Sequence, residues 1–320
     1  MNNNIKILDP NWITGFSDAE GCFRISILKN KKLKLGWGVQ GFYSIILHQK
    51  DKAILELIQK SLGVGKIYKN RDDCVQFLVS SAKELGVIIN HFDKYPLRTY
   101  KNNDYLLFKE ALGMIKSKEH LTLEGFKKLL TIKVSLNKGL TSELKTAFPD
   151  IVGVKRPLVI NKGIPDPQWL AGFASGEGSF YVKIRESKKY QTGYQVLLRF
   201  SIGQHIRDQI FMEEINNIFT FNIETLINGP LQSKGSEETS FGKIYKIGEA
   251  AVDFQVTKIA DIIEKIIPFF DKYPILGEKA KDFEDFKRVA LMIQSGEHLT
   301  LNGLEQIRPI KARMNTGRTY

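Results

Sequence analysis

The chain repeats itself once, and this duplication constrains the fold more than any other feature. A twelve-residue stretch that begins at Trp12 returns at Trp169, so the two copies are offset by 157 residues. The element DKYP at Asp93 returns at Asp271, an offset of 178. The second copy therefore carries about 21 extra residues (178 − 157), most of them in the Gly-, Ser- and Glu-rich stretch 228–242. We expect this stretch to form a long hairpin loop.

The duplication predicts two half-domains with the same architecture. We expect an N-terminal half-domain over residues 1–138, a linker with four prolines over 139–167, and a C-terminal half-domain over 168–320. Hydrophobic spacing within a copy predicts the order αββαββα and an α+β fold, with an antiparallel sheet covered on one face. In the first copy we expect strands at 22–28, 40–48, 65–69 and 75–80, and helices at 13–20, 52–62, 105–115 and 125–136.

Composition bounds the kind of partner. The chain has 320 residues, 42% of them hydrophobic, which is enough for two cores. Its 47 Lys and Arg against 35 Asp and Glu give a net charge of +12, which indicates a polyanionic partner, either nucleic acid or an anionic membrane surface. Cys22 and Cys74 form no CxxC pair, which argues against a structural zinc site. There is no apolar run of about 18 residues, and residues 1–8 resemble neither a signal peptide nor a presequence.

The repeated stretch contains a helix with a stripe of small residues. Gly15 and Ala19 lie four residues apart on one face of the expected helix, and Gly172 and Gly176 do so in the copy. Small residues at this spacing let two helix backbones approach closely. We therefore expect the two helices to pack against each other.

Each of these helices is expected to end on a glutamate. Gly21 and Gly178 follow at once, where a helix commonly stops on a left-handed glycine, so Glu20 and Glu177 are the last helical residues. A carboxylate is badly placed at the partly negative end of a helix. Two such ends packed together would raise both pKa values unless a cation lies between them, and clustered carboxylate and carbonyl oxygens suit Mg²⁺. For either helix alone, a solvated acid beside packing glycines is an alternative; the duplication favours the paired site.

The doubled motif resembles the signature of the LAGLIDADG homing endonucleases, specifically their monomeric two-motif members encoded in organellar introns. Residues 13–21 (ITGFSDAEG) align with that signature residue for residue. In the second copy (LAGFASGEG, 170–178), Ser175 replaces the usual inner acid while Glu177 keeps the essential one. The resemblance covers nearly the whole chain.

The resemblance implies a saddle of two sheets around paired central helices. It implies a monomer that binds a long, asymmetric double-stranded DNA site, cuts both strands across the minor groove and promotes intron mobility in the mitochondrion. Glu20 and Glu177 would bind Mg²⁺ or another divalent cation such as Mn²⁺, assisted by the main-chain carbonyls of Ala19 and Gly176. Metal-activated water would attack the scissile phosphate, whereas Ca²⁺ would bind without supporting cleavage.

Strand alternation gives an independent indication of a DNA-binding face. The expected outward side chains are rich in Arg, Lys, Gln, Ser and Tyr, which suit phosphates and major-groove base edges. An ordinary wetted face explains one such strand equally well, but several strands in each half share this polarity. Because the two faces differ in sequence, the target should be non-palindromic. The candidate contacts are Arg24, Ser26, Gln40, Phe42, Ser44, Lys66 and Tyr68 in the first copy, and Tyr181, Lys183, Arg185, Gln195, Arg199, Ser201, Lys243 and Tyr245 in the second.

Three further residues are candidates for the catalytic site. Lys101 and Lys279 correspond at the offset of 178, just before helices that we expect to start at Asp104 and Asp282. A lysine near the scissile phosphate is common in the family, and a solvated lysine at a helix start is the alternative. Gln204 ends a strand near the expected active site, where it could position water.

Other interpretations stay open. An intron maturase that binds structured RNA, or a DNA-binding protein without catalysis, would share the scaffold and the basic surface. Retention of both motif glutamates favours the nuclease. The histidine pairs His48/His205 and His120/His298 are expected to make local hydrogen bonds in structural positions.

Overall fold

The computed structural model describes residues 7–157, 163–164, 166–221 and 241–315. The chain divides into two compact units, one of Met1–Pro10 with Glu20–Asn161 and the other of Asn11–Ala19 with Lys162–Tyr320. The body of the first central helix therefore packs with the second unit, although it precedes the first unit's sheet in the chain. The expected hairpin loop lies outside the described residues as far as position 240.

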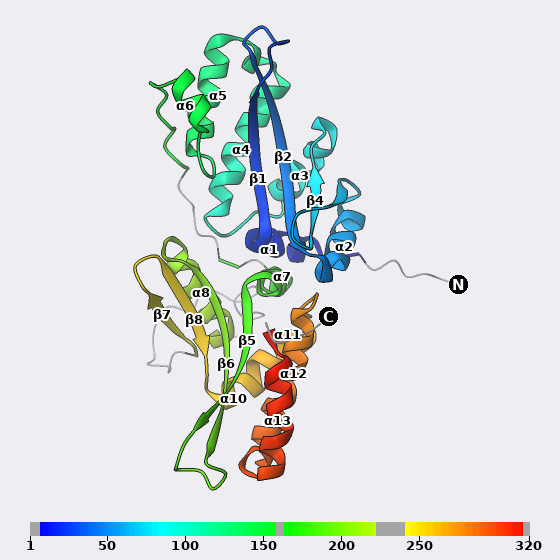
Figure 1. Ribbon diagram of the computed structural model, residues 1–320, viewed down its shortest axis with the longest axis vertical. Helices are drawn as coiled ribbons and strands as arrows, with labels where there is room; N and C mark the ends of the chain where they lie inside the picture. The colour runs from blue at the N-terminus through cyan, green and yellow to red at the C-terminus, as the bar shows by residue number, and fades with distance from the viewer. Residues whose placement is uncertain (1–6, 158–162, 165, 222–240, 316–320) are drawn as a thin grey trace, which may run out of the picture. The chain divides into compact units, whose positions relative to one another are not determined.

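Both halves have the expected order of elements (Figure 1). The first half also contains a helix over 82–94 that has no explicit place in the sequence prediction, and the linker holds a short helix. The first half and linker comprise α1 (Pro10–Glu20), β1 (Gly21–Lys29), β2 (Trp37–His48), α2 (Lys52–Leu62), β3 (Lys66–Lys69), β4 (Cys74–Val79), α3 (Ala82–Lys94), α4 (Lys101–Lys116), α5 (Leu123–Ser135) and α6 (Ser142–Ala147). The second half comprises α7 (Pro167–Glu177), β5 (Gly178–Glu186), β6 (Tyr194–His205), α8 (Gln209–Phe221), β7 (Lys243–Ile247), β8 (Ala251–Val256), α10 (Ile259–Asp261), α11 (Ile267–Lys272), α12 (Lys279–Gln294) and α13 (Leu301–Arg313).

Each half contains one antiparallel four-stranded sheet, in the order β1-β2-β4-β3 or β5-β6-β8-β7. The registers correspond: Gly21 pairs with Ile45 in the first half, and Gly178 pairs with Ile202 in the second. The residue that follows each central helix is thus the first residue of an edge strand, paired with the neighbouring inner strand of its sheet. This pairing fixes where each helix must end.

Alternation along the strands separates a core face from a polar face, as expected. In β1, Phe23, Ile25 and Ile27 are buried while Arg24 and Leu28 are exposed. The Phe23 ring lies 5.3 to 5.5 Å, centroid to centroid, from three aromatic rings of α3 and α4. The helices therefore cover one face of the sheet and leave the polar face open.

Helix α4 begins at Lys101, and its counterpart α12 begins at Lys279, three residues before the expected starts at Asp104 and Asp282. The hydrophobic spacing did not reveal this first turn because it is mostly polar. In α4 the Thr99 hydroxyl accepts a hydrogen bond from the Lys101 amide at 3.2 Å and so supports the earlier start. Both lysines are the first residues of their helices.

One helix of the second half contains an inserted residue. The continuous α3 corresponds to α10, a π-helical segment η4 (Ile262–Ile266) and α11. The offset between the copies is 177 at Val79 and Val256, before this helix, and 178 at Asp93 and Asp271, at its end. A single inserted residue is accommodated in a helix as a π-bulge.

Candidate active site and nucleic-acid interface

Helices α1 and α7 touch at their glycines, as the sequence predicts. A Cβ atom placed on Gly15 would lie 1.9 Å from the carbonyl oxygen of Trp169, and one placed on Gly172 would lie 2.0 Å from that of Trp12. No side chain can occupy either position at this separation. The close approach of the two backbones therefore requires glycine in both motifs.

The helix pair is asymmetric at its inner acid. The Trp169 indole Nε1–H donates to the Asp18 carboxylate at 3.1 Å, and Asp18 is 4% exposed. The symmetric interaction would join Trp12 to position 175, but Ser175 donates to the Ala171 carbonyl and accepts from the Leu276 amide instead. The buried Trp12 Nε1 consequently has no hydrogen-bond partner among the described residues. The sequence revealed the serine but not this consequence.

The motif glutamates end their helices, but the expected left-handed glycines are wrong. Glu20 and Glu177 are the last residues of α1 and α7, and both are half-buried. Gly178 has φ −67° and ψ 146°, an extended conformation, and Gly21 is already paired as the first residue of β1. The chain passes directly from helix to strand, so no left-handed residue is needed. Gly178 is instead required by space, since its Cβ would lie 2.6 Å from the Ala174 carbonyl oxygen.

Each candidate lysine lies near the end of a central helix. The Lys279 ammonium donates to the carbonyl oxygens of Gly176 and, at 3.4 Å, of Ala174. A cation at this position complements the partial negative charge of the helix end. In the first half, burial raises the pKa of the Cys22 thiol, and the charge of Lys101 partly opposes that increase. Lys101 is therefore close to the second residue of β1.

A contact from the linker braces the start of α4, and no sequence pattern predicts it. Arg156 forms an ion pair with Asp104 at 2.9 Å, and its guanidinium lies 5.1 Å from the centre of the Tyr100 ring. Tyr100 directly precedes Lys101, and Asp104 lies three residues after it, so Arg156 contacts both sides of the lysine along the chain. In α5, burial and the nearby charge of Arg24 lower the pKa of Lys133. The first unit thus gathers cationic groups near the start of β1.

Each central helix ends on oxygen atoms of the kind that a hard divalent cation prefers. Each motif glutamate, Glu20 or Glu177, directly follows a residue with a main-chain carbonyl, Ala19 or Gly176, and the Gly176 carbonyl also accepts from Lys279. Within the described ranges, no three or more His, Cys, Asp or Glu side chains are grouped as a metal site. The proposed donor set relies on carbonyl oxygens beside the carboxylates, which is the oxygen chemistry that Mg²⁺ and Ca²⁺ prefer.

Most candidate DNA contacts lie open on the polar faces, with two exceptions. Ser44 and Ser201 stand on these faces by register but are only 6% exposed. Each lies in the second strand of its sheet, between Cys22 and Leu78 or between Ser179 and Gln255, and these neighbours cover the short side chain. Both serines are therefore buried in the protein without DNA, and their contact with DNA remains a prediction. The exposed or half-exposed candidates are Arg24, Ser26, Gln40, Phe42, Lys66 and Tyr68 in the first unit, and Tyr181, Lys183, Arg185, Gln195, Arg199, Lys243 and Tyr245 in the second.

An arginine lies over an aromatic ring at the same cross-strand pair in both sheets. In the first sheet the arginine is in the first strand and the ring in the second, and in the second sheet this arrangement is reversed. The Arg24 guanidinium is 4.8 Å from the ring centre of Phe42, its partner across β1 and β2. The Arg199 guanidinium is 5.1 Å from the ring centre of Tyr181, its partner across β6 and β5. The face of each ring attracts the guanidinium and favours its position on the polar face.

The remaining candidates lie as follows. The ring Nδ1 atoms of His48 and His205 each accept an amide hydrogen bond at 3.2 Å, and those of His120 and His298 lie 3.3 and 3.4 Å from main-chain carbonyls, which confirms their local structural role. Gln204 lies in β6, two residues beyond Ile202, the partner of Gly178. It is thus close to the end of α7. In the described part of the chain, every helix is too short or too polar to cross a membrane.

Residues 13–112 and 170–290 match the LAGLIDADG endonuclease family. A curated relative, "Probable intron-encoded endonuclease 2" of Neurospora crassa, is 39% identical over 317 residues, which cover 95% of this chain and 64% of the relative. Another, "Uncharacterized 50.9 kDa protein in ND4 intron 1" of Podospora anserina, is 45% identical over 120 residues, 37% of this chain and 27% of the relative. The chain spans less than two thirds of the length of these relatives.

Solved structures match over almost the whole chain. The LAGLIDADG meganuclease I-CpaMI, bound to uncleaved DNA, is 46% identical with a TM-score of 0.86, and the match covers 97% of this chain and 100% of that one. The homing endonuclease I-SmaMI, bound to cleaved DNA, is 40% identical with a TM-score of 0.89, over 98% of both chains. I-SmaMI has also been solved with its uncleaved target in the presence of calcium ions.

Proposed function

We propose that this chain, which belongs to the LAGLIDADG endonuclease family, is a site-specific endonuclease that makes a double-strand break in a long, asymmetric DNA target. One chain carries both copies of the motif, so it acts as a monomer. The different side chains on the two polar faces favour a non-palindromic target. The similarity to DNA-bound enzymes over the whole chain supports this assignment.

The observation that carries the proposal is the doubled helix end. Each motif brings a glutamate to the last position of a helix, and the two helices touch at Gly15 and Gly172. A carboxylate there adds to the partial negative charge of the helix terminus, which a bound cation relieves. We assign Glu20 and Glu177 as metal ligands, with the carbonyls of Ala19 and Gly176.

Magnesium is the proposed physiological ion, with manganese as a substitute. The oxygen-only donor set suits both, and calcium would bind without supporting cleavage. When bound, a divalent ion stabilises the charge on a phosphodiester and lowers the pKa of water.

The side chains of the enzyme supply orientation and further charge. Glu20 and Glu177 hold their positions because each directly precedes a residue paired into its sheet. Lys101 and Lys279 place ammonium groups near the helix ends, where they would stabilise negative charge on the scissile phosphates. Gln204 lies near the C-terminal end of β6, two residues beyond the partner of Gly178, where it would orient a water molecule. The polar faces hold the DNA through phosphate and base-edge contacts.

Substitution of the two glutamates tests the assignment. The target is first selected from a randomised duplex library. Glu20→Gln and Glu177→Gln should each abolish the double-strand break while leaving target affinity within a few-fold of wild type. Glu110→Gln, which changes an exposed glutamate of α4, is the matched control and should cleave normally. Full cleavage by either motif variant in Mg²⁺ would refute the assignment.

We further propose that the protein is encoded by a mitochondrial intron and acts in that organelle. The names of relatives, which refer to introns and to ND4, support this location. Expression of a tagged chain from its native gene, followed by fractionation, tests it. Recovery outside the mitochondrial fraction would contradict it.

A further inference from the structure

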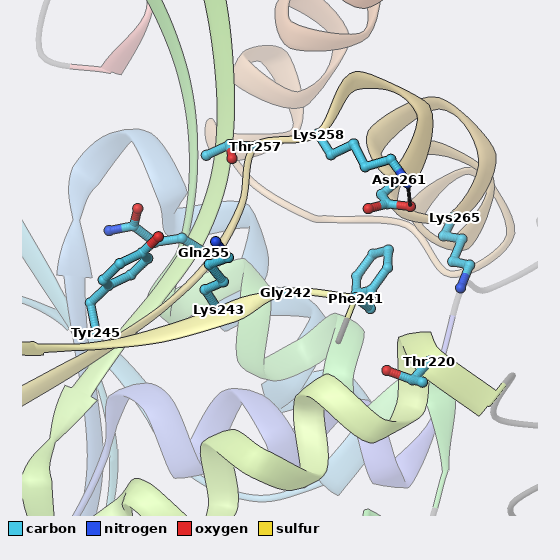
Figure 2. A pocket seen from close by; sticks show the side chains of 10 residues that line it. All are labelled: Thr220, Phe241, Gly242, Lys243, Tyr245, Gln255, Thr257, Lys258, Asp261 and Lys265. Carbon is cyan, nitrogen blue, oxygen red and sulfur yellow. Dashed lines mark ion pairs between the residues drawn. The ribbon is translucent and has the colours of Figure 1, made fainter. Parts of the chain in front are cut away.

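A hollow of about 560 Å³ opens beside the second sheet, at the end of β8 (Figure 2). Its lining includes Phe241, Lys243, Thr257, Lys258, Asp261 and Lys265. These residues come from β7 and Phe241 just before it, from the two residues between β8 and α10, from α10 and from the π-helical segment η4. We call this site the lysine hollow. None of these lining residues belongs to the two repeated motifs or to the ends of α1 and α7.

The charge of the lysine hollow is positive. Among the residues that the structure describes, its lining contains three lysines and one carboxylate, a net charge of 3 − 1 = +2. The carboxylate of Asp261 lies 3.7 Å from the Lys258 ammonium and offsets the charge of Lys258. The charges of Lys243 and Lys265 make the site positive. The Lys265 ammonium lies 4.9 Å from the centre of the buried Phe241 ring, which fixes its place at the wall. Such a site favours an anion.

The hollow continues the polar face of the sheet. Lys243 pairs across the strands with Gln255, and Gln255 pairs in turn with Ser201, so the three form one row. Tyr245, one of the candidate DNA contacts, also borders the hollow. A polyanion that follows this face therefore meets the lysine hollow at the sheet's outer edge.

One lysine of the hollow lies in the π-bulge. Lys265 lies within η4, the segment that contains the inserted residue. Before the bulge the copies correspond at an offset of 177, which matches Lys258 with Ser81; after it, at 178, Lys265 matches Val87. The first half thus has neither lysine at the equivalent positions. π-Bulges are frequent at functional sites, and this one carries a cation to the edge of the polar face.

We propose that the lysine hollow binds a backbone phosphate of the DNA target, beyond the base pairs that face the second sheet. This inference rests on the proposed DNA-binding function and adds to it a contact that lengthens the footprint on one side only. The ligand chemistry is a phosphodiester, held by Lys258 and Lys265 with the hydroxyl of Thr257 nearby. The contact contributes affinity without reading sequence.

The salt dependence of binding tests the proposal. The affinity of the double variant Lys258→Gln/Lys265→Gln and of wild type is measured between 50 and 200 mM salt, on the full target and on duplexes shortened at either end. Each phosphate contact contributes a slope of about 0.9 in log affinity against log salt. If the double variant loses one contact, the ratio of wild-type affinity to variant affinity should fall about three- to fourfold between 50 and 200 mM salt. Lys83→Gln, an exposed lysine of α3 in the first half, is the matched control.

On the full target, we expect the double variant to show a smaller slope of log affinity against log salt than wild type. On a duplex shortened at the end that faces the second half of the protein, we expect the two slopes to be equal. Melting curves establish that the variant remains folded. An unchanged slope, or an equal loss on every duplex, would overturn the proposal. A loss seen only with structured RNA would overturn it in favour of an RNA contact. Failure of wild type to bind any DNA would instead refute the proposed function itself.

Discussion

Alanine at Gly15 should force the central helices apart. The new Cβ would lie 1.9 Å from the Trp169 carbonyl oxygen, 2.8 Å from its carbon and 2.9 Å from the Phe173 amide nitrogen. Because such contacts are essentially never shorter than 3.0 Å, the backbone of α7 must move by about 1.1 Å. These neighbours are all main-chain atoms, so no side-chain rotation relieves the clash.

Overpacking of this kind costs about 1–3 kcal/mol, partly offset by the roughly 1 kcal/mol that alanine gains over glycine in a helix. The matched control is Gly113→Ala in α4, where a Cβ would meet nothing within 4 Å. That variant should be stabilised by about 0.5–1 kcal/mol. The contrast between the two isolates the helix crossing from helix propensity.

Thermal melting and urea denaturation measure the difference. For units of this size, 1 kcal/mol corresponds to roughly 2–4 °C in melting temperature. Gly15→Ala should also slow DNA cleavage, because the helices position the motif glutamates. Gly172→Ala should behave like it, and the double variant should cost less than the sum since both separate the same pair. A rise in stability like that of Gly113→Ala would refute the close approach.

Three further outcomes are expected. Trp169→Phe should cost about 1–3 kcal/mol more in unfolding free energy than Trp12→Phe, because the Trp169 indole donates to buried Asp18 and the Trp12 indole makes no such bond. Equal losses in urea titrations would contradict this. Burial lowers the pKa of His91 from 6.5 to about 4, so the unfolded chain takes up the proton first and stability falls as pH drops from 6.5 to 4, by at most about 3 kcal/mol. Urea titrations of His91→Phe should lack this loss, and an unaltered pH profile would exclude it. Arg156→Ala should lower kcat for cleavage several-fold with little change in target affinity, since it frees the turn that holds the candidate lysine of α4; an unchanged kcat would show that the brace is dispensable.

The duplication made most of the fold predictable. Alternation in β1 identified the core face because apolar and polar side chains strictly alternate from Phe23 to Ile27. The glycine spacing located the helix contact because only small residues permit it. Helix starts were less predictable: the first turn of α4 is mostly polar, so its hydrophobic period is visible only from Tyr105 onward.

Other features depend on contacts between segments that are distant in the chain. The pairing of Trp169 with Asp18 joins residues 151 positions apart, and no local pattern indicates it. The burial of Ser44 follows from its place between two other strands, which alternation alone does not reveal. Sequence patterns do not indicate the brace by Arg156, because this arginine lies in the linker, outside every periodic segment, while its side chain reaches α4.

The central claim is that two helix-end glutamates make this chain a metal-dependent, site-specific nuclease. It is tested most directly by incubating wild-type protein with a randomised duplex library in Mg²⁺, in Ca²⁺ and in EDTA, and sequencing both bound and cleaved molecules. We expect double-strand breaks within one non-palindromic sequence in Mg²⁺, and binding of the same sequence without breaks in Ca²⁺. Cleavage that persists in EDTA, or binding in Mg²⁺ without any break, would contradict the claim.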